Sequence, residues 1–101
     1  MATYSALKAV NKTLVADTVD TVNLSQTATQ LIVANLDHSG QPIYFTFADA
    51  ALGTSTPTVA GDNCFAVTHG PHGVINLPMS GVPIQVKLIS SGSQKYSIMV
   101  V

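Results

Sequence analysis

The residues best suited to chemistry in this sequence are His69-Gly70-Pro71-His72, with Asp62 and Cys64 a few residues upstream. Two imidazoles, a thiolate and a carboxylate are all ligands that zinc accepts. Structural zinc sites, however, usually pair Cys or His at tight spacing on both sides, and this chain has one cysteine. A Gly-Pro step between the histidines is also typical of a turn. We therefore predict two exposed loop histidines, a buried Cys64 that packs as a small apolar residue, and no metal or other cofactor.

The acidic residues suggest no catalytic arrangement. General acid–base catalysis needs a titratable group held in a cleft, with its pKa tuned by its neighbours. The sequence contains neither a Gly-x-Ser-x-Gly motif nor a Gly-rich phosphate loop, and it has no glutamate. Its aspartates fall mostly at turns or on expected outward faces, where they cap loops or solvate the surface; they are Asp17, Asp20, Asp37, Asp49 and Asp62. We predict that the protein is not an enzyme.

Three tyrosines, Tyr4, Tyr44 and Tyr96, offer a different chemistry, since aromatic faces can stack on sugar rings. Tryptophan is absent, and the simpler interpretation is that these rings lie half-buried at the rims of the fold with wet hydroxyl groups. A carbohydrate- or cell-surface-binding module therefore stays open as an alternative.

The elements that must position these residues are short β-strands. β-Branched residues and alternating runs are broken at roughly 8–12-residue intervals by Gly, Pro, Asn or Asp, which is typical of a sandwich or small barrel. Residues 83–90 and 43–47 alternate most clearly between apolar and polar side chains. We predict one all-β domain over residues 1–101, a small antiparallel β-sandwich of about 7–8 strands. The further strands are expected at 13–19, 21–24, 29–36, 64–68, 73–77 and 95–101.

The connections differ in how clearly they can be interpreted. Residues 37–40 and 91–93 have the composition of hairpin loops. Residues 1–10 fit an edge strand, one helical turn, or an arm that reaches a neighbouring molecule. The longest irregular stretch, 50–62, is the best candidate for a contact loop, because loops of this length in compact domains are often functional.

Charge is scarce: charged residues make up 9% of the chain, against about 25% in ordinary soluble domains, and the net charge is -1. Four scattered lysines without any arginine argue against nucleic-acid binding. No apolar stretch approaches the roughly 20 residues that span a bilayer, and the first residues lack a signal-peptide pattern. We expect a product made in a cytosol that neither enters a membrane nor binds nucleic acid.

A surface with so little charge suits broad contact with protein, because protein interfaces are depleted of charge at their centres. Exposed apolar residues such as Leu52, Val59 and Met79 would be assets in such a contact. The predicted contact residues come from the long loop and the N-terminal segment; they are Leu52, Thr54, Thr56, Pro57, Val59, Tyr4 and Leu7.

Several segments of the sequence resemble small β-sandwich accessory proteins of tailed-phage virions. They include Pro57-Thr58-Val59-Ala60-Gly61-Asp62-Asn63 and Val86-Lys87-Leu88-Ile89-Ser90-Ser91-Gly92, together with residues 22–33, 42–46 and 95–98. The resemblance lies in the strand pattern and the loop sequences, and it covers most of the chain from about Val22 onward. The sequence differs from that pattern at Cys64 and at residues 69–72, and its first twenty residues are not covered.

This resemblance implies a capsid decoration (cement) protein that binds the outer surface of the major capsid protein in the virion and stabilises the shell. A decorator of a quasi-symmetric lattice is expected to be a homo-oligomer, with a trimer favoured. A neck or tail accessory protein is the alternative within the same class.

Overall fold

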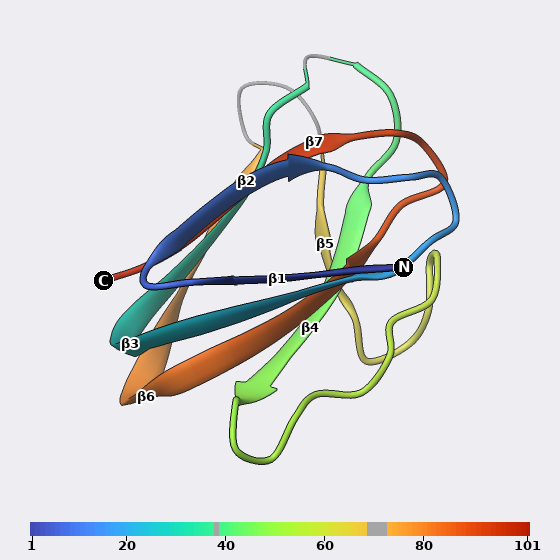
Figure 1. The fold of residues 1–101 in the computed structure, drawn as a ribbon. Coiled ribbons are helices and arrows are strands. Elements are labelled where there is room, and N and C mark those ends of the chain that lie inside the picture. The colour runs from blue at the N-terminus through green and yellow to red at the C-terminus, as the bar shows by residue number, and fades with distance from the viewer. Residues whose placement is uncertain (38, 69–72) are drawn as a thin grey trace.

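The computed structural model describes residues 1–37, 39–68 and 73–101, and these residues form seven β-strands and no helix (Figure 1). The strands are β1 (Ala2–Ala6), β2 (Ala9–Thr13), β3 (Asp20–Asn35), β4 (Ile43–Asp49), β5 (Phe65–Val67), β6 (Val74–Ile89) and β7 (Lys95–Val100). The predicted all-β fold is confirmed. None of the described residues belongs to a helix long and apolar enough to cross a membrane.

Two long strands organise the fold. The strands are hydrogen-bonded in the order β2-β7-β3-β6-β4-β5, and β1 adds to β3 as the one parallel pair among the described strands. β3 and β6 have 16 residues each and pair along most of their length, and both double back at the same end of the molecule (Figure 1). The sheet is thereby folded into two layers. The first layer contains β1, β4, β5, the first half of β3 and the second half of β6; the second contains β2, β7 and the other two halves.

The fold line of this sheet is made by two compensating bulges. Between Leu24 and Ala28, β3 advances four residues while β6 advances two; between Ala28 and Gln30, β3 advances two while β6 advances four. Bulges bend a strand and sharpen its twist, so two of them side by side turn both strands together. Gly81 lies in the β6 bulge with φ of +81°, a backbone conformation that residues with a Cβ rarely adopt.

The core lies between the two layers and follows the alternation of the strands. Val22 and Leu24 of the first layer are buried, whereas beyond the bulges the buried positions of β3 are Leu31 and Val33. The inward-facing set therefore changes from even to odd residue numbers across the fold line. The largest buried side chains from the remaining strands are Ile43, Phe45, Val86, Leu88, Tyr96 and Ile98.

A hydrogen bond between two buried side chains joins the layers through the core. The Tyr96 hydroxyl of β7 donates to the Asp20 carboxylate of β3 at 3.0 Å, and both side chains are almost fully buried. Burial raises the pKa of Asp20 above its usual value near 3.8, although the bond from Tyr96, the N-terminal charge and the Ala2 N–H all act in the opposite direction. Burial and the neighbouring carboxylate also raise the pKa of Tyr96, so this hydroxyl keeps its proton.

An amide cluster closes one end of the sandwich. The Gln94 side chain accepts a hydrogen bond from the Gln41 N–H at 3.2 Å and donates to the Asn35 side chain at 3.3 Å. It thereby ties the β3–β4 connection to the β6–β7 connection. Gly40, with φ of +113°, passes so close to Gln94 that a Cβ there would overlap its amide.

Several sequence-based expectations are corrected by this topology. Residues 37–40 and 91–93 are not hairpin loops, because β3 does not pair with β4, nor β6 with β7, and each connection crosses between layers. Residues 14–19 form a turn with Asp17 at φ of +58°, so the strand expected at 13–19 is wrong beyond its first residue. The first ten residues form β1 and β2, one in each layer, rather than a free arm.

Gly81→Ala tests the fold line. We expect the substitution to lower the unfolding free energy by about 1 kcal/mol, because a left-handed backbone costs a residue with a Cβ roughly that amount and no atom lies near enough to clash. Chemical denaturation measures the change, with Ser80→Ala at the adjacent exposed position as control. Equal effects of the two substitutions would contradict the role of Gly81.

Asp20→Asn tests the bond between the layers. Because the folded-state pKa of Asp20 is raised, its contribution to stability is fully present below the unfolded-state pKa and is lost as pH rises through the folded-state pKa. We expect the unfolding free energy of the wild type, relative to Asp20→Asn, to decline from about pH 3 towards neutrality. Denaturation curves across this range measure it. A difference between the wild type and Asp20→Asn that stays flat over this pH range would refute the assignment.

Candidate binding surface

The connection between β4 and β5, residues 50–64, carries five of the seven predicted contact residues. It begins with a turn built on Asp49, whose carbonyl accepts hydrogen bonds from the N–H groups of Leu52 and Gly53, both at 2.9 Å. The Asp49 carboxylate accepts another from the Ala51 N–H at 2.9 Å. Gly53 completes the turn with φ of +76°. The turn is therefore held by its own backbone and projects Leu52 beyond the end of β4.

The next part of this loop lies on the outer face of the first layer. The Thr54 N–H donates to the Gln85 side-chain oxygen at 3.0 Å, and Gln85 donates in turn to the Asn23 side chain at 3.0 Å. The Thr46 hydroxyl donates to the Ser55 carbonyl. These bonds fasten the loop to three neighbouring strands, β3, β6 and β4. A loop anchored in this way loses little further entropy when it binds a partner.

The predicted loop residues differ in exposure. Leu52 is 85% exposed and Val59 is 38% exposed, and Thr56 is exposed beside them. Thr54 is half-buried by its contact with Gln85, and Pro57 is buried, which suits a residue that fixes the loop rather than one that meets a partner. The loop thus presents Leu52, Thr56 and Val59 to solvent.

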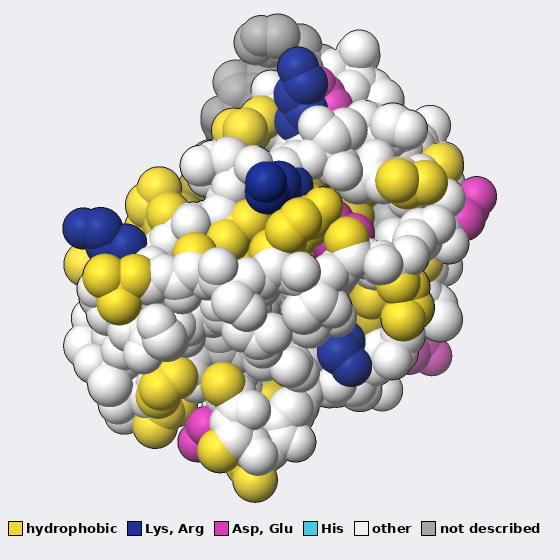
Figure 2. All heavy atoms as spheres, in the orientation of Figure 1, with side chains coloured by type: hydrophobic (Ala, Val, Ile, Leu, Met, Phe, Trp, Pro, Cys, Tyr) yellow, Lys and Arg dark blue, Asp and Glu magenta, His cyan; other side chains and the backbone are white. Residues whose placement is uncertain are grey.

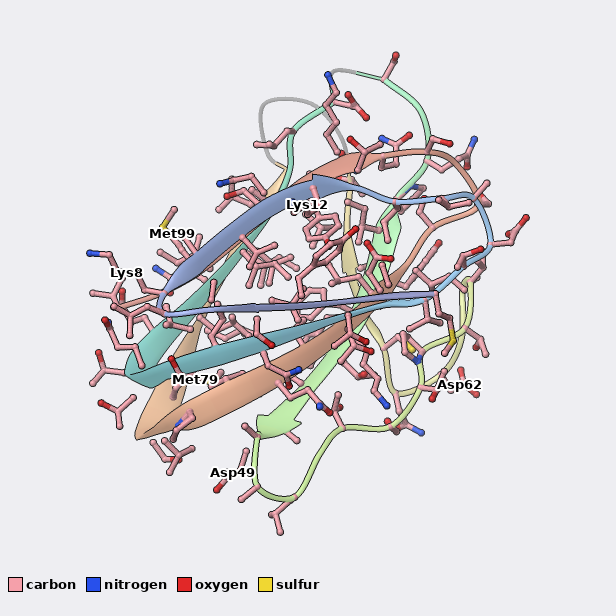
Figure 3. The ribbon with its side chains drawn as sticks, in the orientation of Figure 1. Lys8, Lys12, Asp49, Asp62, Met79 and Met99 are labelled. Carbon is pink, nitrogen blue, oxygen red and sulfur yellow. The ribbon has the colours of Figure 1, made fainter. Side chains whose placement is uncertain are left out.

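The two N-terminal contact residues also differ. Leu7 lies in the turn between β1 and β2 and is 63% exposed. Tyr4 faces the core and is only partly buried, with the Lys12 ammonium 4.9 Å from the centre of its ring. Figure 3 shows Lys12 on the side of β2 that faces β1. Leu7 is therefore available to a partner directly, whereas Tyr4 mainly supports the edge of the sandwich.

A groove lies between the two predicted contact segments, although none of the seven predicted contact residues lines it. It has a volume of about 490 Å³ and is lined by Ser5 and Ala6 of β1, by Ala50 at the start of the loop, and by Asn23, Leu24, Ser25 and Pro83 between them. All of these residues are uncharged. Figure 2 shows that apolar and uncharged polar side chains make up most of the visible surface, with few lysines and acidic side chains. The groove therefore suits a neutral partner.

The described residues contain no candidate metal site. No group of three or more His, Cys, Asp or Glu side chains there could hold a metal ion. The predicted exposed histidines at 69 and 72 lie outside the described residues, as does His38. Cys64 is only partly buried rather than fully buried as expected, and its thiol lies 3.7 Å from the Asp62 carbonyl oxygen.

Comparison with known proteins gives the fold a context. No protein-family model matches the chain, and no curated protein matches it. A carbohydrate-binding module found in a sugar cane soil metagenome, solved with cellopentaose and gadolinium ion, is similar with a TM-score of 0.54 and 15% identity over 97% of this chain and 90% of that one. The pre-peptidase C-terminal domain of a collagenase from Bacillus anthracis has a TM-score of 0.54 and 14% identity, over 100% and 95%. The fold is that of a small β-sandwich module.

The tyrosines of this β-sandwich do not form one platform. Tyr96 is fully buried and engaged with Asp20, and Tyr4 packs against the core. Tyr44 lies on β4, partly buried, with its Cα paired to Ile89. Stacking of a sugar across all three rings is therefore not available.

Sequence reasoning missed the polar residues that line the groove, Ser5, Asn23 and Ser25. The alternation of Thr21, Asn23 and Ser25 with buried Val22 and Leu24 was the available signal, because it marks an outward-facing polar row. Asp20 was also misassigned to a turn or an outward face, whereas its side chain is buried.

Gln85→Ala tests the anchoring of the loop. We expect the amide of Thr54 to lose protection from hydrogen exchange at least about tenfold, since a lost hydrogen bond of about 1.4 kcal/mol corresponds to that factor. Exchange measured by NMR reports the change. Lys87→Ala, on the same face of β6, is the control, and equal protection of Thr54 in wild type and Gln85→Ala would refute the anchor.

Proposed function

We propose that this chain is a non-catalytic binding protein that attaches to a larger protein assembly, as a decoration protein on the outer surface of a tailed-phage capsid. The observation that carries the proposal is the uncharged groove between β1 and the anchored 50–64 loop, with Leu7 and Leu52 exposed. The identification of this assembly as a phage capsid rests on the resemblance of the loop and strand sequences.

The chemistry of this surface fits a neutral protein partner. Exposed leucines are costly on a free surface but favourable in a contact, and interface centres are poor in charge. Burying one such leucine side chain contributes about 1.5–3 kcal/mol. A contact with few charges also depends little on salt, because screening acts on charge–charge interactions.

Repetition on a lattice compensates for a small contact. Each bound copy stabilises the assembled capsid, by an amount that grows with the ratio of the free protein concentration to Kd. A shell offers many equivalent sites, so a modest affinity per copy adds up over the particle. A neck or tail station of the virion would use the same surface, but it offers far fewer sites.

A carbohydrate-binding module is the second candidate. Ser5, Asn23 and Ser25 line the groove, and their hydroxyl and amide groups are suited to hydrogen bonds with sugar hydroxyls. The similar carbohydrate-binding module was solved with cellopentaose. Against this candidate, an open platform of stacked tyrosines is missing, as described above.

Capsid binding is the decisive experiment. The purified protein is mixed with undecorated capsids assembled from the major capsid protein encoded in the same genome, and bound copies are counted by co-sedimentation and cryo-EM. We expect regular occupancy of lattice sites. Leu52→Asp should raise the Kd at least about tenfold, because it places a charge in an apolar contact.

Val15→Asp is the matched control, since Val15 is 64% exposed and belongs to the turn between β2 and β3. Its binding should equal that of the wild type. Absence of lattice binding, together with binding on a glycan array, would replace the capsid proposal with the carbohydrate one. Binding to neck or tail structures alone would also refute decoration.

A further inference from the structure

The outer face of the second layer consists of two adjacent rows of side chains. One row contains Ala9, Met99, Ile32 and Asn76, and the next contains Asn11, Ser97, Ala34 and Val74, each in the strand order β2-β7-β3-β6. These positions point outward because the alternate residues Val10, Ile98 and Val33 are buried. Figure 3 shows Met99 projecting away from the body of the molecule, beside Lys8.

This face is less polar than a solvated sheet face usually is, because five of its eight side chains are apolar and none is charged. An antiparallel sheet with one face on the core usually carries polar side chains on the other. Here the two rows contain no charged residue, Met99 is 39% exposed and Val74 is 57% exposed. Lys8 and Lys95 lie at the margins, where their long side chains can keep the ammonium groups in solvent. Such a face is characteristic of a protein contact.

Next to this face, the first half of β6 has an edge that pairs with no described strand, and this edge is poorly suited to accept another strand. The Asn35 N–H donates to the Gly73 carbonyl at 2.8 Å, so residues 75 and 77 also direct their backbone groups towards β3. Residues 74, 76 and 78 then direct theirs to the open edge. Pro78 has no N–H group, so an added strand would lose a hydrogen bond there. The face, and not the edge, is therefore the surface for association.

We infer that the outer face of the second layer binds the same face of a second copy of this chain. The two copies are related by a two-fold axis that lies between the facing sheets and runs perpendicular to the strands. This axis places the first row of each copy against the second row of its partner. Ile32 and Met99, the large residues at the centre, then meet Ala34 and Ser97, the small ones. The packing is complementary in shape, and it is uncharged on both sides. Sheets packed face to face interdigitate in this way about 10 Å apart.

The size of the face sets the strength of the contact. Four strands about 4.8 Å apart, with some six residues each of about 3.4 Å, cover roughly 20 by 20 Å. That is small for a permanent dimer, whose interfaces are larger and more apolar. We expect a reversible dimer with a dissociation constant in the micromolar range, not a permanent one. A net charge of -1 leaves little electrostatic repulsion between the copies.

This contact is independent of the surface proposed to bind a capsid. The anchored loop lies on the outer face of the first layer, and the dimer contact uses the outer face of the second. An isologous contact of one face with itself gives a two-fold dimer, whereas a trimer needs two different patches. The inference thus departs from the trimer implied by the resemblance.

Sedimentation equilibrium over a range of protein concentrations is the test. We expect a monomer–dimer equilibrium that approaches twice the 10.5 kDa chain mass. Met99→Lys should raise the dimer dissociation constant at least about tenfold by placing an ammonium group at the apolar centre. Ile32→Lys is a second variant at the same centre, and circular dichroism checks that both remain folded. Thr3→Lys, exposed on the first layer, should dimerise like the wild type.

Three results would overturn the inference. One is a monomer at every concentration up to about 1 mM; another is a stable trimer. The third is a dimer that folded Met99→Lys and Ile32→Lys leave intact. If Met99→Lys abolished capsid binding while the wild type stayed monomeric, the face would belong to the capsid contact instead. Failure of the Leu52→Asp test has no bearing on this equilibrium, so the two proposals can fail separately.

Discussion

The fold depends on bending two long strands at the same place without losing their pairing. β3 and β6 accomplish this with bulges of opposite sense, so the register before the fold line and after it is the same. Across the fold line the buried positions of β3 change from even to odd residue numbers, which keeps apolar side chains facing the core in both layers. A single bulge of this kind would leave the pair two residues out of register beyond the fold line.

Folding one sheet over itself gives the molecule two outer faces of different chemistry. The first layer carries hydroxyl and amide groups outward, and these bind the 50–64 loop through Gln85 and Thr46. The second layer carries Ile32, Ala34 and Val74 outward, with no such loop anchored to them by the hydrogen bonds of the described residues. Asn23 connects the two features, because its side chain accepts the hydrogen bond from Gln85 and also lines the groove.

The sequence was sufficient for the fold class and for the strands with regular alternation, such as those around Phe45 and Val86. It was not sufficient for the length of β3 and β6, because each bulge interrupts the period of two and makes one strand look like two. Turn-forming residues correctly predicted that the chain reverses direction near Gly40 and Gly92. Which strands pair with one another depends instead on contacts between residues distant in sequence. Asp20 was misjudged because its partner, Tyr96, is 76 residues away.

The contact surface could be predicted only in part from the sequence, because it also depends on contacts between residues distant in sequence. The exposure of Leu52 and Leu7 follows from local sequence, since each lies in a turn. That Ser5 and Ala50 face one groove depends on the parallel pairing of β1 with β3 and on the pairing of β4 with β6. The outer face of the second layer also arises from register, because Met99 and Ile32 become neighbours only when β7 pairs with β3. Since both surfaces come from register and lie on different layers, a substitution on one changes the other only if it disturbs the shared core.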